Sequence, residues 1–155
     1  MRFSDLNLKV RYDIYTRTKK ILRKYQKGII SGKLTAEKFT DNMLKDESMV
    51  FYLEEIGIHI SEFRQAYKEY VETLITIQND CLTHHTSKVP SFYSKRADFA
   101  SIFKLYELLS ANGYSLFIPA QYLTEWDIIC IEKFLETGNI DVGNEKIYNY
   151  IGRNT

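Results

Sequence analysis

Helical periodicity is the feature of this sequence that most restricts its fold. Apolar residues recur every three or four positions through most of the chain, and only two prolines and seven glycines interrupt its 155 residues. Such spacing places apolar side chains on one face of an α-helix. Because β-rich folds need many turn residues, the low Gly and Pro content also favours long helices. We therefore predict an all-α protein of six to seven helices.

Capping and turn residues divide this pattern into separate helices. Thr35, Asp46 and Ser61 are typical helix N-caps, and Gly57 is a typical helix end. The predicted helices cover residues 8–30, 35–45, 47–56, 61–82, 95–111, 124–136 and 144–151. We expect a compact bundle, with at most one short strand near residues 114–118.

One interruption marks a candidate boundary within the chain. Residues 84–94 form the longest stretch without helical periodicity, and Pro90 breaks any helix there. We predict a single helical domain over residues 1–155, with a subdomain break in the loop 84–94 as the alternative.

The helix predicted at residues 95–111 is expected to bury its aromatic side chains. These residues follow the three- and four-residue spacing that is typical of a buried helix face. The predicted inward residues are Phe99, Ile102, Phe103, Tyr106 and Leu109.

Charge is distributed very unevenly along the chain. Residues 1–33 contain ten Lys/Arg and two acids, a net charge of +8, whereas the other 122 residues contain 11 Lys/Arg and 18 acids, a net charge of −7. The formal total is only +1. Such asymmetry is typical of a chain whose basic end meets a polyanion or an acidic partner.

The helix predicted at residues 8–30 carries most of this positive charge. Its apolar residues fall within one arc about 140° wide, and its Lys and Arg side chains fall mainly on the other side. Four of them are spaced 3, 4 and 3 residues apart and form a basic ridge about 15 Å long. This basic ridge consists of Arg17, Lys20, Lys24 and Lys27. We predict that it binds nucleic-acid phosphates together with Arg23, and that Tyr12 on the same face stacks on a base or bonds a phosphate.

Other roles for this helix stay open. Its basic face could be solvated, or it could pack against the protein's own acidic half. It could also bind an anionic membrane surface or an acidic protein partner.

The segment from residue 47 to residue 68 resembles the helix-turn-helix of DNA-binding regulators. Gly57 stands at the turn position, and Tyr52, Ile56, Ile58, Phe63 and Ala66 stand at the buried positions. The resemblance implies a recognition helix that starts at Ser61 and makes base contacts in DNA. Its outward side chains would be Arg64, Gln65 and Lys68.

This segment departs from the family pattern at two points. Leu53 stands where the family prefers a small residue, because two helices approach closely there. Residues 46–72 also contain seven acids and only two bases. A plain helical corner is the alternative interpretation.

Residues 79–85 offer two further hypotheses. Cys81, His84 and His85 are residue types that ligate zinc, but no paired spacing supports a metal site, so we predict no metal and no cofactor. The Asn-Asp-x-x-x-His pattern is similar to the Arg-x(4–6)-His signature of HEPN-type helical ribonucleases, with Asn79 in place of the Arg. That resemblance implies acid–base chemistry by a histidine.

Catalytic motifs are otherwise missing from the sequence. It contains no glycine-rich phosphate loop, no Gly-x-Ser-x-Gly elbow and no His-Glu-x-x-His pair. We therefore predict a protein without enzymatic activity, with the helical ribonuclease as the alternative.

Together these features predict a small nucleic-acid-binding or regulatory protein. DNA is the expected partner, an acidic protein is the alternative, and a homodimer is a further option. No stretch approaches 18 apolar residues and the N-terminus lacks a secretory pattern, so we expect no membrane span and a cytoplasmic location. The rival hypothesis is a helical adaptor or inhibitor that binds a protein through exposed aromatic residues. Candidates for that aromatic patch are Phe92, Tyr93, Tyr148 and Tyr150.

Overall fold

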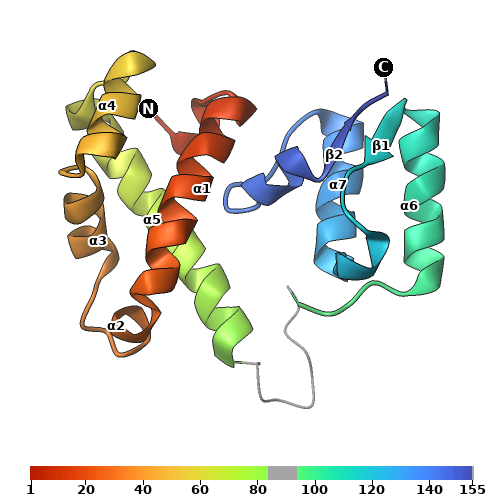
Figure 1. Ribbon diagram of the computed structural model, residues 1–155, viewed down its shortest axis with the longest axis horizontal. Helices are drawn as coiled ribbons and strands as arrows, with labels where there is room; N and C mark the ends of the chain where they lie inside the picture. The colour runs from red at the N-terminus through yellow and green to blue at the C-terminus, as the bar shows by residue number, and fades with distance from the viewer. Residues whose placement is uncertain (84–93, 155) are drawn as a thin grey trace. The chain divides into compact units, whose positions relative to one another are not determined.

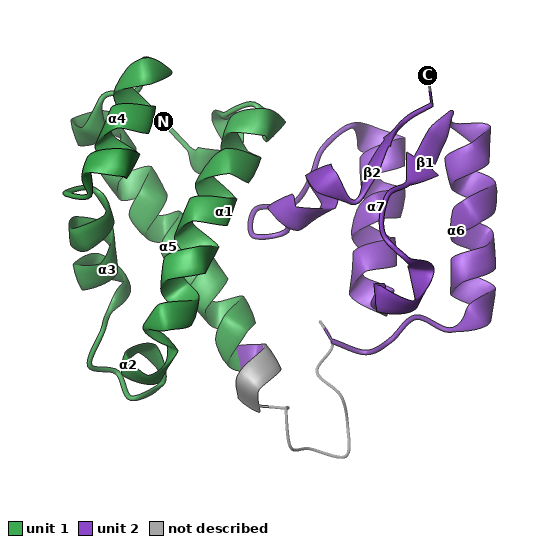
Figure 2. Ribbon diagram, viewed as in Figure 1, with its two compact units in different colours: residues 1–79 green, residues 80–155 purple. Residues whose placement is uncertain are grey.

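The structure is a computed structural model that describes the backbone of residues 1–83 and 94–154 and the side chains of residues 1–80 and 94–154. These residues form seven α-helices and one two-stranded sheet, which confirms the predicted all-α class (Figure 1). The chain divides into two compact units, Met1–Asn79 and Asp80–Thr155 (Figure 2). The predicted break at residues 84–94 falls largely on residues 84–93, which lie outside the described residues.

The first unit, residues 1–79, is built from five α-helices. Capping residues start three of them, as Asn7 accepts a hydrogen bond from the backbone N–H of Val10, Thr35 from that of Lys38, and Asp46 from that of Met49. Such caps satisfy N–H groups that a helix leaves unpaired in its first turn. The helices are α1 (Leu8–Lys24), α2 (Gln26–Ile30), α3 (Ala36–Met43), α4 (Glu47–Glu55) and α5 (Ile60–Thr83), whose last residues extend past the unit boundary.

The core of the first unit is aromatic and centres on α5. The ring of Phe3 stacks on that of Tyr70 with centroids 3.7 Å apart, and Phe63 stacks on Tyr67 at 5.2 Å. The buried hydroxyls of Tyr67 and Thr18 are hydrogen-bonded at 2.7 Å, which ties α5 to α1. Because a buried hydroxyl without a partner costs free energy, this bond lets a polar group lie inside the core.

The predicted helix at residues 8–30 is interrupted. Tyr25 leaves helical geometry, with φ −106° and ψ 19°, and separates α1 from α2. The turn that follows α2 folds back on it, because the backbone N–H of Leu34 donates to the carbonyl of Gly28 at 2.9 Å. Lys27 therefore lies on α2, and the predicted basic ridge does not run along a single helix.

The second unit contains two helices and the sheet. They are α6 (Phe99–Ala111), β1 (Tyr114–Leu116), α7 (Glu125–Thr137) and β2 (Ile151–Arg153). The strands pair antiparallel, with Tyr114 opposite Arg153 and Leu116 opposite Ile151. A strand near residues 114–118 was predicted. Its partner strand was not predicted. The helix predicted at residues 144–151 was wrong, because residues 145–149 form only a short 3₁₀-helix. The chain then extends beside β1, where the N–H of Phe117 donates to the carbonyl of Tyr150 at 2.7 Å.

The aromatic residues of α6 face solvent, so their predicted burial was wrong. Phe99 is 82% exposed, Phe103 57% and Tyr106 49%. Leu109 is buried as predicted and Ile102 is half-buried, and the helix packs against α7 with the face that carries Leu109 and the fully buried Leu105, which was not predicted. The exposed aromatic residues and the buried leucines both follow helical spacing, so periodicity alone cannot tell which set is covered.

Two acidic residues of the second unit are buried. Asp127 and Glu145 are each about 1% exposed. Asp127 caps the N-terminus of α7, and Glu145 accepts a hydrogen bond from the backbone N–H of Gly143 at 3.0 Å. These carboxylates serve the fold of the second unit. Among the residues described, no helix combines the length and the apolar character needed to cross a membrane.

Candidate nucleic-acid interface and adjoining cleft

The structure places the first half of the basic ridge beside α3 and α4. Buried Ile14, Thr18 and Leu22 hold α1 against the core. The neighbouring row of α1 contains Arg17, Lys20 and Lys24 and borders a cleft that α3 and α4 also line. The ridge is therefore one wall of a concave surface within the first unit.

Arg17 is held in place by α4. Its guanidinium donates a hydrogen bond to Ser48 Oγ at 2.7 Å and lies 4.7 Å from the ring centroid of Tyr52. Tyr52 in turn donates to Asp13 Oδ2 at 3.1 Å. Burial, followed by the hydrogen bond to Asp13 and the charge of Asp13, raises the pKa of Tyr52 to about 12, so its hydroxyl remains a donor at neutral pH. Both partners of Arg17 are neutral, and no described carboxylate forms an ion pair with it.

Four other cations of this region have no partner among the described residues. Lys20, Arg23, Lys24 and Lys27 are exposed, and no described residue forms a hydrogen bond or ion pair with any of them. Unpaired, solvated cations can exchange counterions for phosphates at little cost. These four side chains and Arg17 are the strongest cationic feature of the first unit.

The predicted residues do not all share one face of α1. At about 100° per residue, Tyr12 and Arg23 lie roughly 100–140° around the helix from Arg17 and Lys24. Tyr12 is half-buried, and its ring centroid lies 6.4 Å from that of Tyr15. The prediction that Tyr12 lies on the face of the basic ridge was wrong, because that ridge continues along the row that borders the cleft.

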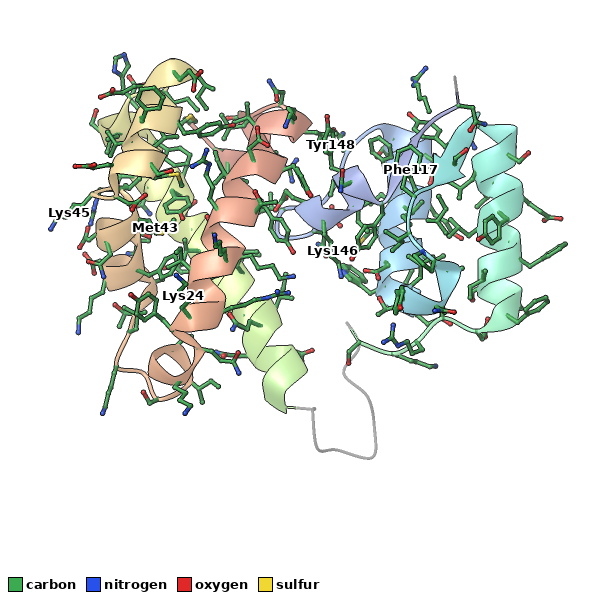
Figure 3. All side chains as sticks on the ribbon, in the orientation of Figure 1. Lys24, Met43, Lys45, Phe117, Lys146 and Tyr148 are labelled. Atoms are coloured by element: carbon green, nitrogen blue, oxygen red, sulfur yellow. The ribbon has the colours of Figure 1, made fainter. Side chains whose placement is uncertain are left out.

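The cleft is a feature that sequence analysis missed. It has a volume of about 550 Å³ and lies between α1, α3 and the first turn of α4. Its floor includes Phe39, Met43 and Met49, which are at most 6% exposed. Figure 3 shows Met43 between α3 and α1, with Lys24 near it and Lys45 on the other side of α3. The inward positions of α3 were predictable, but the hollow left between them and α1 was not.

A turn at the predicted glycine joins α4 to α5. Gly57, with φ +79°, follows α4, and the backbone N–H of Ile58 donates to the carbonyl of Leu53 at 2.9 Å. Phe63 and Ala66 of α5 are buried as predicted. Leu53 is fully buried at the position where the DNA-binding family prefers a small residue. The remaining predicted core residues, Tyr52, Ile56 and Ile58, are half-buried.

The predicted base-reading side chains of α5 are mostly engaged within the protein. Arg64 forms an ion pair with Asp41 of α3, and Gln65 donates to Glu69 Oε1 at 3.2 Å. Lys68 is half-buried. Because α3 presents Asp41 to Arg64 and Asn42 to the cleft, Arg64 and the basic ridge lie on different sides of α3.

The histidines of the metal-site and ribonuclease hypotheses are not among the described residues. His84 and His85 lie outside the described residues, as do Phe92, Tyr93 and the side chain of Cys81. Within the part of the chain that is described, no three His, Cys, Asp or Glu residues converge as a metal site would require. Among the other aromatic candidates, Tyr148 is 36% exposed and Tyr150 is half-buried.

Comparison with known proteins adds no relative. No protein-family model, no curated protein and no solved structure matches this chain. Its function is therefore inferred from the side chains themselves.

Proposed function

We propose that this protein is a small cytoplasmic nucleic-acid-binding regulator that contacts the phosphate backbone through α1 and α2. The observation that carries the proposal is a set of exposed cations for which the described part of the chain offers no partner, Lys20, Arg23, Lys24 and Lys27. Arg17 adds a fifth positive charge, and contacts with Ser48 and Tyr52 orient its guanidinium group.

This proposal assigns affinity and specificity to different parts of the first unit. Phosphate contacts supply affinity without regard to sequence, whereas base contacts supply specificity. Arg64 would have to leave Asp41, and Gln65 would have to leave Glu69, before either could contact a base. We therefore expect binding with low sequence preference, and α5 is the secondary contact.

Fluorescence anisotropy across a salt series tests the proposal on labelled duplex DNA, single-stranded DNA and RNA. Contacts to about four phosphates predict a log–log salt slope of about −3 to −4. Lys20→Glu with Lys24→Glu should weaken binding to every sequence at least tenfold. Lys38→Glu with Lys45→Glu makes the same change of charge on exposed lysines away from the cleft and should have a smaller effect. Equal losses in the two double variants, or no binding at low salt, would refute the assignment.

The aromatic face of α6 favours a second candidate function, protein–protein interaction with a second copy of the chain as partner. Phe99, Phe103 and Tyr106 form one exposed row on the helix. In an antiparallel pair of α6 helices with the twofold axis between Phe103 and Tyr106, each Phe103 meets the other Tyr106. Lys104 and Glu107 of opposite copies then lie on the same flank, which gives the row complementary charges.

Sedimentation velocity over a range of protein concentrations tests this second candidate. Phe103→Ser with Tyr106→Ser should shift the parent from dimer to monomer. Tyr122→Ser removes another exposed aromatic ring of the second unit and should leave the dimer intact. A parent that is monomeric at every concentration would exclude self-association through α6.

A further inference from the structure

The cleft beside the basic ridge has a composition that phosphate binding alone does not explain. A nucleic-acid backbone would contact its cationic rim and leave the buried floor empty. The volume of about 550 Å³ lies within the range of small-molecule sites, which are mostly apolar with a few convergent polar groups. Here the floor of the cleft supplies the apolar surface, and its rim supplies the polar groups.

The floor suits an apolar body. Phe39, Met43 and Met49 form its deep part, and Ile21 and Leu34 add aliphatic surface. Methionine side chains are unbranched and polarizable, so they adapt to ligands of irregular shape. No charged side chain is needed to bind this part of a ligand.

The rim suits one anionic group on the α1 side. Lys20 and Lys24 border the cleft and are without a partner among the described residues, and Arg17 points at the same rim from its contacts with Ser48 and Tyr52. Asp46 is the acid on the opposite rim, where its carboxylate accepts the N–H of Met49 and caps α4. The negative head of a ligand is therefore expected near the lysines and away from Asp46.

We propose that this cleft binds a small organic anion with an apolar body, whose carboxylate or phosphate lies at Lys20 and Lys24 and whose chain or ring lies on Met43 and Met49. The proposal goes beyond nucleic-acid binding and does not depend on it, although the two lysines are shared. It identifies a ligand class by charge complementarity at the rim and by burial at the floor.

Methyl NMR of methionine tests the proposal directly. The chain has three methionines, of which Met43 and Met49 lie in the cleft and Met1 is 54% exposed at the N-terminus. With ¹³C-methyl methionine, decanoate below its micelle-forming concentration should shift the Met43 and Met49 signals and leave that of Met1 in place. Met43→Leu and Met49→Leu assign the signals. Shifts of all three signals, or of none, would overturn the proposal.

Head-group recognition is tested with matched probes and variants in the same experiment. Decyltrimethylammonium has the same chain with a positive head and should not bind, and binding equal to that of decanoate would overturn the proposal. Lys20→Gln with Lys24→Gln should weaken decanoate binding about tenfold or more, because hydrogen bonds to charged groups are lost. Lys38→Gln with Lys45→Gln should bind like the parent. No nucleic acid is present, so failure here is separate from failure of phosphate binding.

Discussion

The ammonium of Lys146 lies 2.8 Å from Asp127 Oδ1, a carboxylate oxygen on a side chain that is only 2% exposed. The pair ties the 3₁₀-helix at residues 145–149 to the first turn of α7, where Asp127 also accepts the backbone N–H of Thr124 at 3.0 Å. Burial lowers the pKa of Lys146, but the negative charge of Asp127 prevails, so the net pKa is raised. The ion pair is therefore present throughout the neutral range.

Lys146→Met should destabilise the second unit. Breaking a buried ion pair leaves its partner uncompensated and costs about 3–5 kcal/mol when both groups are buried. Because Lys146 is 29% exposed, we expect a loss of about 2 kcal/mol. Urea unfolding measures this loss of stability. The fluorescence of Trp126, the only tryptophan of the chain and a residue of α7, reports the unfolding.

Lys133→Met is the matched control for that loss. It removes an ion pair with Asp141 whose two side chains are 49% and 45% exposed, and exposed pairs contribute little to stability. If the two variants are equally stable, the pair formed by Lys146 and Asp127 does not stabilise the fold.

The thiol of Cys130 should be unreactive in the folded protein. Burial, with smaller contributions from the charges of Asp141 and Asp127, raises the pKa of this thiol to about 12. In a Cys81→Ser background, Ellman's reagent at pH 8 should label Cys130 only after urea unfolds the chain. Rapid labelling of the native protein at pH 8 would show that Cys130 is not buried as described.

The same pKa shift makes stability depend on pH. The folded thiol keeps its proton up to about pH 12, whereas an unfolded thiol loses it above its ordinary pKa of about 8.5. Its contribution to stability is present below about pH 8.5 and is lost as the pH rises toward about 12. In Cys130→Ala the stability should fall less steeply over this range than in the parent.

Two glycines of the first unit should respond to alanine with opposite signs. Gly57 has φ +79°, which disfavours any side chain, so Gly57→Ala should cost about 1 kcal/mol although no atom lies within 4 Å of the new Cβ. Gly28 lies within α2, and its Cβ would meet Leu34 Cβ at an ordinary 3.5 Å. Gly28→Ala should therefore stabilise by about 0.5–1 kcal/mol. Thermal unfolding followed by the circular dichroism signal of the helices compares the stabilities of the two variants. Stability changes of the same sign would contradict the turn geometry.

Removing Asp41 should strengthen nucleic-acid binding. Asp41→Asn frees Arg64 from its ion pair, so one more phosphate contact becomes available and the salt slope should steepen by about one. Glu37→Gln makes the same change of charge on α3 without freeing a cation. The anisotropy assay compares the two variants. An identical gain in affinity and slope would mean that Arg64 makes no contact.

The predictable part of the fold is the part encoded locally. Thr35 and Asp46 cap the helices that they were expected to cap, and Gly57 adopts the positive φ expected of a turn glycine. These features depend on a few neighbouring residues, so their physical causes are visible in the sequence. The cationic character of α1 was predictable in the same way.

The candidate site was predictable only in its parts. Lys20 and Lys24 were placed on the basic ridge from the sequence, but the apolar floor behind them comes from α3 and α4, which are distant in sequence. Arg64 was predicted to face outward, and its ion pair with Asp41 across two helices could not be foreseen from either segment alone. Such pairings depend on how helices pack.

The sequence by itself determined the helical class, the caps and turns, and the concentration of positive charge in its first 33 residues. Only the tertiary structure decided which apolar residues of α6 are buried, because Leu105 is covered while Phe99 and Phe103 are exposed. It also decided that a strand at residues 151–153 pairs with β1 and that a cleft opens beside Lys24. The physical reason is the same in each case. Periodicity and capping are local properties, whereas burial, strand pairing and cavities arise from contacts between segments that are far apart in the chain.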